Sequence, residues 1–240
     1  MLKNNTSTGL KSIKIILLGI ALLLVWYVIS ITFELALASF YIDLEKFFDS
    51  FHYLIIDWIS ENLILIFIVF LILKKNKQSF MDLGWSGGFE FKKIVLILTI
   101  GIFLWIAQVS ITYYSRLFLP ENFPANEMMN IFEKHSTLYN KVILFFLLVI
   151  VTPIGEEIFM RGFIYRLLRL EYNTYISILI STLIFIIFHP VLAWLPSLII
   201  VNIVICLIYE KSKLIWDPIL LHASINFLGF INIVFNIGFH

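Results

Sequence analysis

Long apolar segments follow one another along the whole sequence, and most of them have the length needed to cross a bilayer. A membrane-spanning α-helix needs about 20 consecutive apolar residues, whereas a barrel strand needs about ten residues that alternate in polarity. We expect helical spans at about 14–36, 54–73, 93–114, 141–168, 174–189, 197–210 and 215–236. The sequence therefore predicts an all-α fold, a polytopic transmembrane helix bundle of about seven spans.

The composition agrees with a membrane protein. Of the 240 residues, 61% are hydrophobic and 14% are charged, which is more apolar material than a water-soluble domain can bury. The formal net charge is +1 and the basic residues form no single patch, so no nucleic-acid partner is expected. The single cysteine, Cys206, excludes an internal disulfide. We interpret residues 1–240 as one integral membrane domain in contact with the lipid bilayer.

The distribution of charge gives an orientation. Basic residues are concentrated in the connections on the N-terminal side of the membrane, such as Lys74, Lys75, Lys77, Lys92 and Lys93. The positive-inside rule therefore predicts a multi-pass protein of the cell membrane with a cytoplasmic N-terminus. The many Ile, Lys, Asn and Phe residues indicate an AT-rich bacterial genome. On the outer side, residues 118–140 are expected to form an amphipathic surface helix.

Two of the predicted spans depart from the simple apolar pattern. The second is the weakest, because Asp57 and Glu61 confine its apolar core to Asn62–Leu73 and place its outer end at the interface. The fourth carries Glu156, Glu157 and Arg161 inside an apolar run. Ionisable groups at membrane depth are costly, so they are usually paired, turned toward a cavity, and functional.

The spacing within the fourth span separates its two carboxylates. Glu157 and Arg161 are four residues apart, so they can form an ion pair on one helix face. Glu156 is rotated by about 100° from its neighbour along the 3.6-residue turn. We therefore expect Glu156 to keep a free carboxylate.

Polar residues of catalytic type recur in the later spans. Phe185 and His189 are four residues apart at the end of the fifth, and His222 and Asn226 are four apart in the seventh. The segment His189–Pro196 has a proline near each end and separates two short spans. Non-helical backbone at membrane depth must be sheltered by protein or line a wet cavity. This segment is a second marker for a site.

These groups resemble a known set of motifs. Glu156-Glu157-x-x-x-Arg161, Phe185-x-x-x-His189 and His222-x-x-x-Asn226, in this order on successive hydrophobic segments, are similar to the three motifs of the CPBP intramembrane proteases. This group, also called the Abi family, includes CAAX-type prenyl endopeptidases and bacteriocin-processing or bacteriocin-immunity proteins. The motif-bearing core is about residues 141–236. The resemblance implies an all-helical fold with an intramembrane active site that hydrolyses a peptide bond of a protein or small peptide precursor.

The individual residues fit roles in that chemistry. Glu156, which is not committed to the arginine, is expected to be the base that activates water. His189 would share this water or stabilise the oxyanion. Glu157 and Arg161 would hold the geometry.

His222 with Asn226 would complete the polar lining of the site. A second option is that a metal ion takes part in the hydrolysis. Glu156, His189 and His222 form a His₂Glu set, the ligand class of many catalytic zinc sites. The sequence lacks the HExxH helix of soluble metalloproteases, and a metal-free glutamate mechanism is equally open. No organic cofactor is expected.

Two non-hydrolytic functions compete with the protease interpretation. One is a membrane immunity or scaffold protein that binds a bacteriocin, a peptide or a sensor protein; the other is a proton-coupled transporter. Matching broken spans in two halves, typical of transporters, are not seen, and a scaffold need not retain Glu156 and His189. We expect an enzyme acting on a peptide or membrane-protein substrate, in peptide or bacteriocin maturation or self-immunity. The sequence does not fix the oligomeric state.

A working site has a geometric requirement. The fourth, fifth and seventh spans must be neighbours, with a water-accessible recess near His189–Pro196. We expect side-chain atoms of Glu156 and His189 within about 6 Å, which allows one bridging water, and His222 in the same pocket.

Overall fold

The computed structural model describes residues 6–38, 51–87, 90–118, 137–189 and 194–235, and this part of the chain contains helices and no strand. The main helices are α1 (Thr6–Ala38), α3 (Phe51–Lys75), α4 (Phe91–Arg116), a composite helix (Leu138–Glu171), α9 (Thr174–Ile187), α10 (Leu195–Ser212) and α11 (Trp216–Val234). Six of them are long and apolar enough to cross a membrane, and α9 is shorter with 14 residues. The predicted all-α bundle of about seven spans is confirmed.

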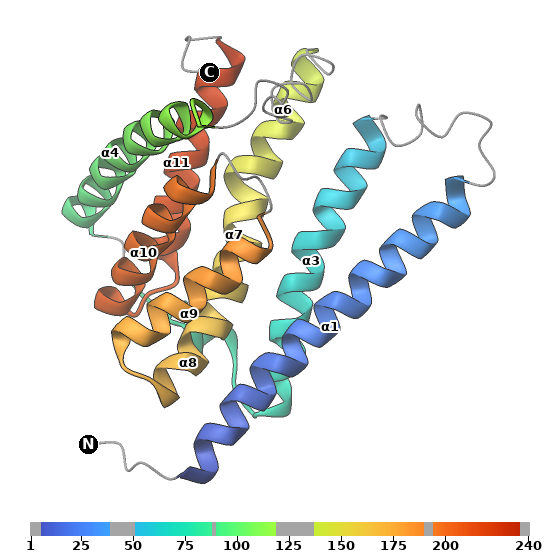
Figure 1. The fold of residues 1–240 in the computed structure, drawn as a ribbon, viewed down its shortest axis with the longest axis vertical. Helices are drawn as coiled ribbons and strands as arrows, with labels where there is room; N and C mark the ends of the chain where they lie inside the picture. The colour runs from blue at the N-terminus through green and yellow to red at the C-terminus, as the bar shows by residue number, and fades with distance from the viewer. Residues whose placement is uncertain (1–5, 39–50, 88–89, 119–136, 190–193, 236–240) are drawn as a thin grey trace.

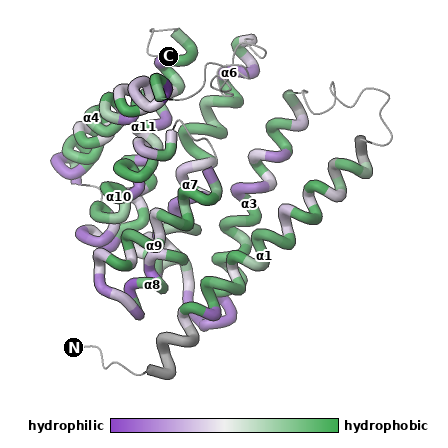
Figure 2. Tube along the Cα trace, in the orientation of Figure 1, coloured by the Kyte–Doolittle hydropathy of each residue, from purple (hydrophilic) through white to green (hydrophobic). Residues whose placement is uncertain are grey.

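The composite helix lies at the centre of the bundle. It packs against α3 on one side and against α11 on the other, while α4, α10 and α11 form a group of their own (Figure 1). The helix α1 begins and α11 ends at opposite ends of the bundle. Figure 2 shows apolar residues along most of each helix and polar residues mainly near the helix ends. Exposed apolar side chains such as Val28 and Phe103 therefore suit a lipid-facing surface.

The composite helix is not uniform. It consists of α6 (Leu138–Phe146), η2 (Leu147–Val151), α7 (Thr152–Glu157), η3 (Ile158–Tyr165) and α8 (Arg166–Glu171), and both η2 and η3 are π-helical. A proline lacks the N–H that continues the hydrogen-bond ladder, and Pro153 is the second residue after η2. Single π-helical stretches inside α-helices occur frequently at functional sites. Here they flank the six residues that end with the two adjacent glutamates.

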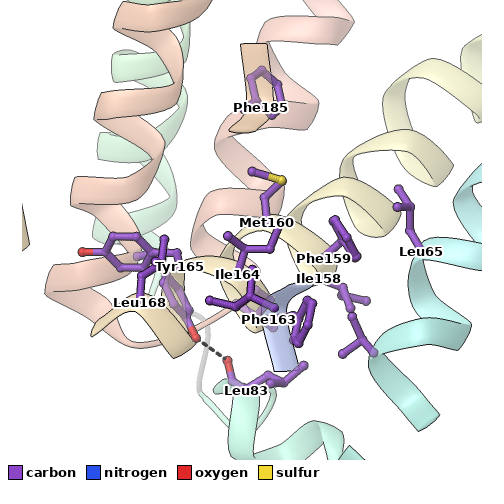
Figure 3. Packing of buried hydrophobic residues seen from close by; sticks show 14 of the residues in the cluster. Leu65, Leu83, Ile158, Phe159, Met160, Phe163, Ile164, Tyr165, Leu168 and Phe185 are labelled. Atoms are coloured by element: carbon purple, nitrogen blue, oxygen red, sulfur yellow. Dashed lines mark hydrogen bonds between the residues drawn. The ribbon is translucent and has the colours of Figure 1, made fainter. Parts of the chain in front are cut away.

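The connection between α3 and α4 docks firmly against the bundle. Its short helix η1 (Phe80–Leu83) inserts Leu83 beneath η3, where Phe163 and Ile164 pack (Figure 3). Tyr209 Oη donates to the Leu83 carbonyl at 3.3 Å, and Trp216 Nε1 donates to the Trp85 carbonyl at 3.1 Å. These contacts cover this end of η3 with protein.

Two expectations about connections need comment. The second span was expected to have its outer end at the interface, but α3 is one continuous helix from Phe51 to Lys75. A helix of this length keeps Asp57 and Glu61 inside a possible crossing segment, and the position of its outer end relative to the interface stays a prediction. The expected amphipathic helix at 118–140 falls largely on residues 119–136, and the recess near His189–Pro196 includes residues 190–193. Both ranges lie outside the described residues.

Candidate intramembrane active site

A cavity of about 440 Å³ lies among all the main helices. This volume is within the range of small-ligand pockets, roughly 300–1,000 Å³. Its lining is mostly apolar and aromatic, with a set of polar groups that includes Glu61, Glu156, His189, Asn202, His222 and Asn226. The cavity therefore combines an apolar enclosure with a few converging polar groups, as substrate-binding sites do.

Glu156 and His189 face each other across this cavity. His189 Nε2 is 4.0 Å from Glu156 Oε1, and the side chains are 30% and 20% exposed. The expected separation below about 6 Å is confirmed. Glu156 Oε2 is buried and has no hydrogen-bond partner among the described residues. Glu156 thus keeps the free carboxylate oxygen that its position on the helix predicted.

The Phe185-x-x-x-His189 spacing fixes the histidine ring. His189 Nδ1 lies 3.0 Å from the Phe185 carbonyl oxygen, and the two rings stack with centroids 4.2 Å apart. Because a carbonyl oxygen can only accept, Nδ1 carries the proton in the neutral ring and Nε2 is an acceptor. His189 Nε2 and the Glu156 carboxylate therefore face each other 4.0 Å apart, and with a neutral ring both are acceptors.

Glu157 lies in a different environment. Its Oε1 accepts from Arg161 Nη1 at 2.9 Å and from His222 Nδ1 at 2.8 Å, and both Glu157 and Arg161 are fully buried. The predicted Glu157–Arg161 ion pair is confirmed. His222 was expected to complete the polar lining of the site with Asn226; the structure instead pairs it with Glu157, because α11 packs directly on α7. His222 nevertheless lines the cavity that was predicted.

A chain of buried polar groups continues behind the arginine. Arg161 Nη2 donates to Asn202 Oδ1 at 2.5 Å, and Asn202 Nδ2 donates to Thr182 Oγ1 at 2.7 Å. All three side chains are buried, so these bonds connect η3, α10 and α9 in a low-dielectric interior. Asn202 thus forms a hydrogen-bonded link between three helical segments.

Asn226 is tied to the irregular helix geometry. In η2 the N–H of Thr152 bonds to the carbonyl of Leu147, five residues earlier. The next donor in that pattern would be Pro153, which has no N–H, so the Leu148 carbonyl is left without it. Asn226 Nδ2 donates to this carbonyl at 2.9 Å. An amide nitrogen carries two hydrogens, so one N–H remains available at the cavity wall.

The three motif-bearing spans meet around the cavity, although not all of them pack on one another. The composite helix packs on both α9 and α11. The helices α9 and α11 meet mainly through α10, on which each of them packs. The site is therefore assembled by four helices, with α10 supplying Asn202.

Two cavity residues were missed from the sequence. Tyr27 Oη of α1 donates to Glu61 Oε1 of α3 at 2.5 Å, and both side chains line the cavity. Glu61 was treated as the end of an apolar core. It lies 14 residues before Lys75, the last residue of α3, and at ~1.5 Å per residue this is ~21 Å along the helix. This depth was the signal that could have identified it.

A zinc ion held by Glu156, His189 and His222 is one of the two options that the sequence leaves open. Among the described residues, no group of three or more His, Cys, Asp or Glu side chains is arranged to hold a metal ion. His222 Nδ1 is bonded to Glu157, whereas the carboxylate that His189 Nε2 faces is that of Glu156. The residues as arranged do not fit a His₂Glu zinc site, and no chemical step below uses a metal.

The fold and the cavity define a class: a multi-pass helical membrane protein with a carboxylate–histidine site enclosed among its spans. Residues 138–228 match the sequence model of one family, described as type II CAAX prenyl endopeptidase Rce1-like. This match contains all three motifs and confirms the resemblance to the CPBP intramembrane proteases. It supports, in general terms, an intramembrane endopeptidase of the CAAX type. No curated protein and no solved structure matches the chain.

Proposed function

We propose that the chain hydrolyses a peptide bond at membrane depth with Glu156 as the base. The observation that supports this most directly is the pair of acceptors, Glu156 Oε1 and His189 Nε2, 4.0 Å apart in a cavity. One water can bridge two acceptors at this spacing, donating one hydrogen to each. A water held in this way is oriented for deprotonation by the carboxylate.

The reaction then follows from the same groups. Glu156 takes a proton from the bridging water, and the water oxygen attacks the carbonyl carbon of the scissile peptide bond. The electron pair of the C=O bond moves to its oxygen, and the remaining N–H of Asn226 donates to this oxyanion. When the C–N bond breaks, Glu156 returns its proton to the departing nitrogen. The products are a carboxylic acid and an amine.

The fully buried groups have a positioning role in this proposal. Arg161 neutralises Glu157, so the Glu157 carboxylate accepts from His222 Nδ1–H without adding net charge to the site. His222 is therefore held in position through its Nδ1, and its side chain lines the cavity. This contact holds α11, and with it Asn226, in register with the composite helix.

The proposed substrate is a peptide or a membrane-protein segment, because the cavity is mostly apolar and lies among membrane-length helices. We place the activity in peptide or bacteriocin maturation or in self-immunity at the cell membrane of a bacterium, with the N-terminus in the cytoplasm. A non-catalytic immunity or scaffold protein would bind such a peptide without cutting it. These two functions differ in whether they need the Glu156 carboxylate.

The test compares secreted and membrane-associated peptides from cells that carry the wild type, no protein, or Glu156→Gln. We expect at least one peptide to be shortened only with the wild type. Glu90→Gln is the matched control, since Glu90 is exposed just before α4 and outside the cavity. If Glu156→Gln supports the same peptide processing, or the same immunity, as the wild type, the Glu156 carboxylate is not needed for the function. The peptidase proposal then fails, and a non-catalytic immunity or scaffold function replaces it.

A further inference from the structure

Glu61 is the one cavity carboxylate that the hydrolytic mechanism does not use. It lies on the same face of α3 as Trp58 and Leu65, which also line the cavity. Its only hydrogen bond is the one from Tyr27 Oη at 2.5 Å, and it forms no ion pair with any described residue. Arg116, the single Lys or Arg in the described lining, does not pair with it.

An ionisable group at this depth requires compensation. Carboxylates within membrane spans are rare, and they are found paired or facing a cavity that has a function. Glu157 meets this requirement with Arg161 inside the protein, whereas Glu61 accepts a hydrogen bond from Tyr27 and pairs with no described Lys or Arg. Because Glu61 lines the cavity, a cation that enters the cavity can serve as its partner.

The surrounding side chains suit a cation as well. Trp58, Trp105, Tyr113 and Trp194 line the same cavity. Aromatic faces attract ammonium and guanidinium groups through their quadrupoles, most strongly where water is excluded. A carboxylate together with aromatic walls is a recognition chemistry for a basic group on an otherwise apolar ligand.

We propose that Glu61, held by Tyr27, is a subsite that binds a basic group of the substrate peptide, either a basic side chain or a free amino terminus. The inference rests on the proposed peptidase function and deepens it, because it names a specificity determinant. Tyr27 and Glu61 lie outside residues 138–228, whereas Glu156, His189 and His222 lie inside that family match. The shared part of the chain thus supplies the chemistry, and α1 and α3 supply selection.

The test measures binding without turnover. Full-length Glu156→Gln protein in detergent is titrated calorimetrically with an acetylated, amidated Leu-Ala-Lys-Ala-Leu peptide, and with the same peptide carrying norleucine in place of lysine. A third probe is the norleucine peptide with a free amino terminus. The Glu156→Gln background prevents cleavage of the peptides. It also ensures that a preference for basic peptides is not due to the Glu156 carboxylate.

We expect the lysine peptide, or the free-amine peptide, to bind at least roughly tenfold more tightly than the neutral one, as a hydrogen-bonded charge contributes on this scale. Adding Glu61→Gln should abolish this preference, Tyr27→Phe should weaken it, and Glu90→Gln should leave it intact. Whichever of the two basic probes gains affinity identifies the source of the amine.

Equal affinity for all three peptides, no measurable binding of any of them, or a preference that survives Glu61→Gln would overturn the proposal. Glu61→Gln keeps an oxygen for Tyr27 to donate to, so a folding defect is not expected; Tyr27→Phe gives a second, independent variant. Because the readout is binding, its failure is distinct from failure of the peptidase function, which appears as absence of cleavage by the wild type.

Discussion

Glu156 and Glu157 are adjacent in the sequence, yet they occupy opposite environments. Glu157 is fully buried, and one of its oxygens accepts from both Arg161 and His222. Glu156 is partly exposed in the cavity, 4.0 Å from His189 Nε2, with its other oxygen unbonded to any described residue. A rotation of about 100° per residue is enough to place one carboxylate in the protein interior and the other at the reaction space.

The two glutamates differ in how the free-energy cost of a carboxylate at membrane depth is offset. Glu157 is compensated inside the protein by a guanidinium, so its removal should be felt mainly as lost stability. Glu156 lacks a cation within hydrogen-bond distance, so it is available to take a proton from water. For these two neighbouring carboxylates, compensation within the protein marks the structural one, and its absence beside the cavity and His189 marks the chemical one.

The largest expected effect is on catalysis. Glu156→Gln should reduce peptide cleavage by about 10²–10⁴-fold, the usual contribution of a general base. Its melting temperature in detergent should stay close to that of the wild type, because the amide has nearly the same shape. Cleavage is measured on the processed peptide by mass spectrometry, with Glu90→Gln as control. Wild-type turnover by Glu156→Gln would remove the distinction between the two glutamates.

The next effect is on stability. Arg161→Ala leaves Glu157 buried without its cation, which should cost about 3–5 kcal/mol of stability. The matched control is Arg169→Ala: Arg169 pairs with Glu210 at 3.1 Å, but its side chain is 28% exposed. The Arg169–Glu210 pair is partly solvated and shares its carboxylate with Tyr165 and Lys213, so Arg169→Ala should cost less stability than Arg161→Ala. Both variants are measured by thermal unfolding in the same detergent. Similar losses for the two arginines would show that burial does not distinguish their ion pairs.

Much of this arrangement could be predicted from local spacing. Residues four apart on a helix share a face, so the Glu157–Arg161 pair and the Phe185–His189 contact follow from the sequence alone. The number of helices follows from the lengths of the apolar runs. These features depend on one helix at a time.

The remaining features depend on which helices meet. His222 bonds to Glu157 because α11 packs on α7, and nothing within either segment specifies this. The bond from Asn226 to Leu148 arises from a π-helical stretch beside Pro153, which apolar periodicity does not reveal. Glu61 was missed because a charge was taken to end a span, when the depth along α3 placed it inside.

A smaller effect separates the two histidines. His222→Ala removes one of the two donors to buried Glu157 Oε1, so it should lower stability by about 1–3 kcal/mol as well as activity. His189→Ala removes a side chain that is 30% exposed and whose hydrogen bond is to the Phe185 carbonyl four residues earlier, so activity should fall while stability changes little. Thermal unfolding and cleavage of the same samples check both. Loss of stability in His189→Ala alone would reverse the assignment of the two histidines.

The smallest expected effect is that of metal removal. A catalytic metal needs several donors directed at one point, and in the described residues no three His, Cys, Asp or Glu side chains are so arranged. We therefore expect purified protein to keep its cleavage activity after dialysis against EDTA and 1,10-phenanthroline, with less than one equivalent of zinc by elemental analysis. Inhibition that is reversed by added zinc would mean that Glu156, His189 and His222 move together to bind it. Glu156 would then be a zinc ligand and not the base that activates water. The two glutamates would differ in the cation that each binds, zinc for Glu156 and the Arg161 guanidinium for Glu157.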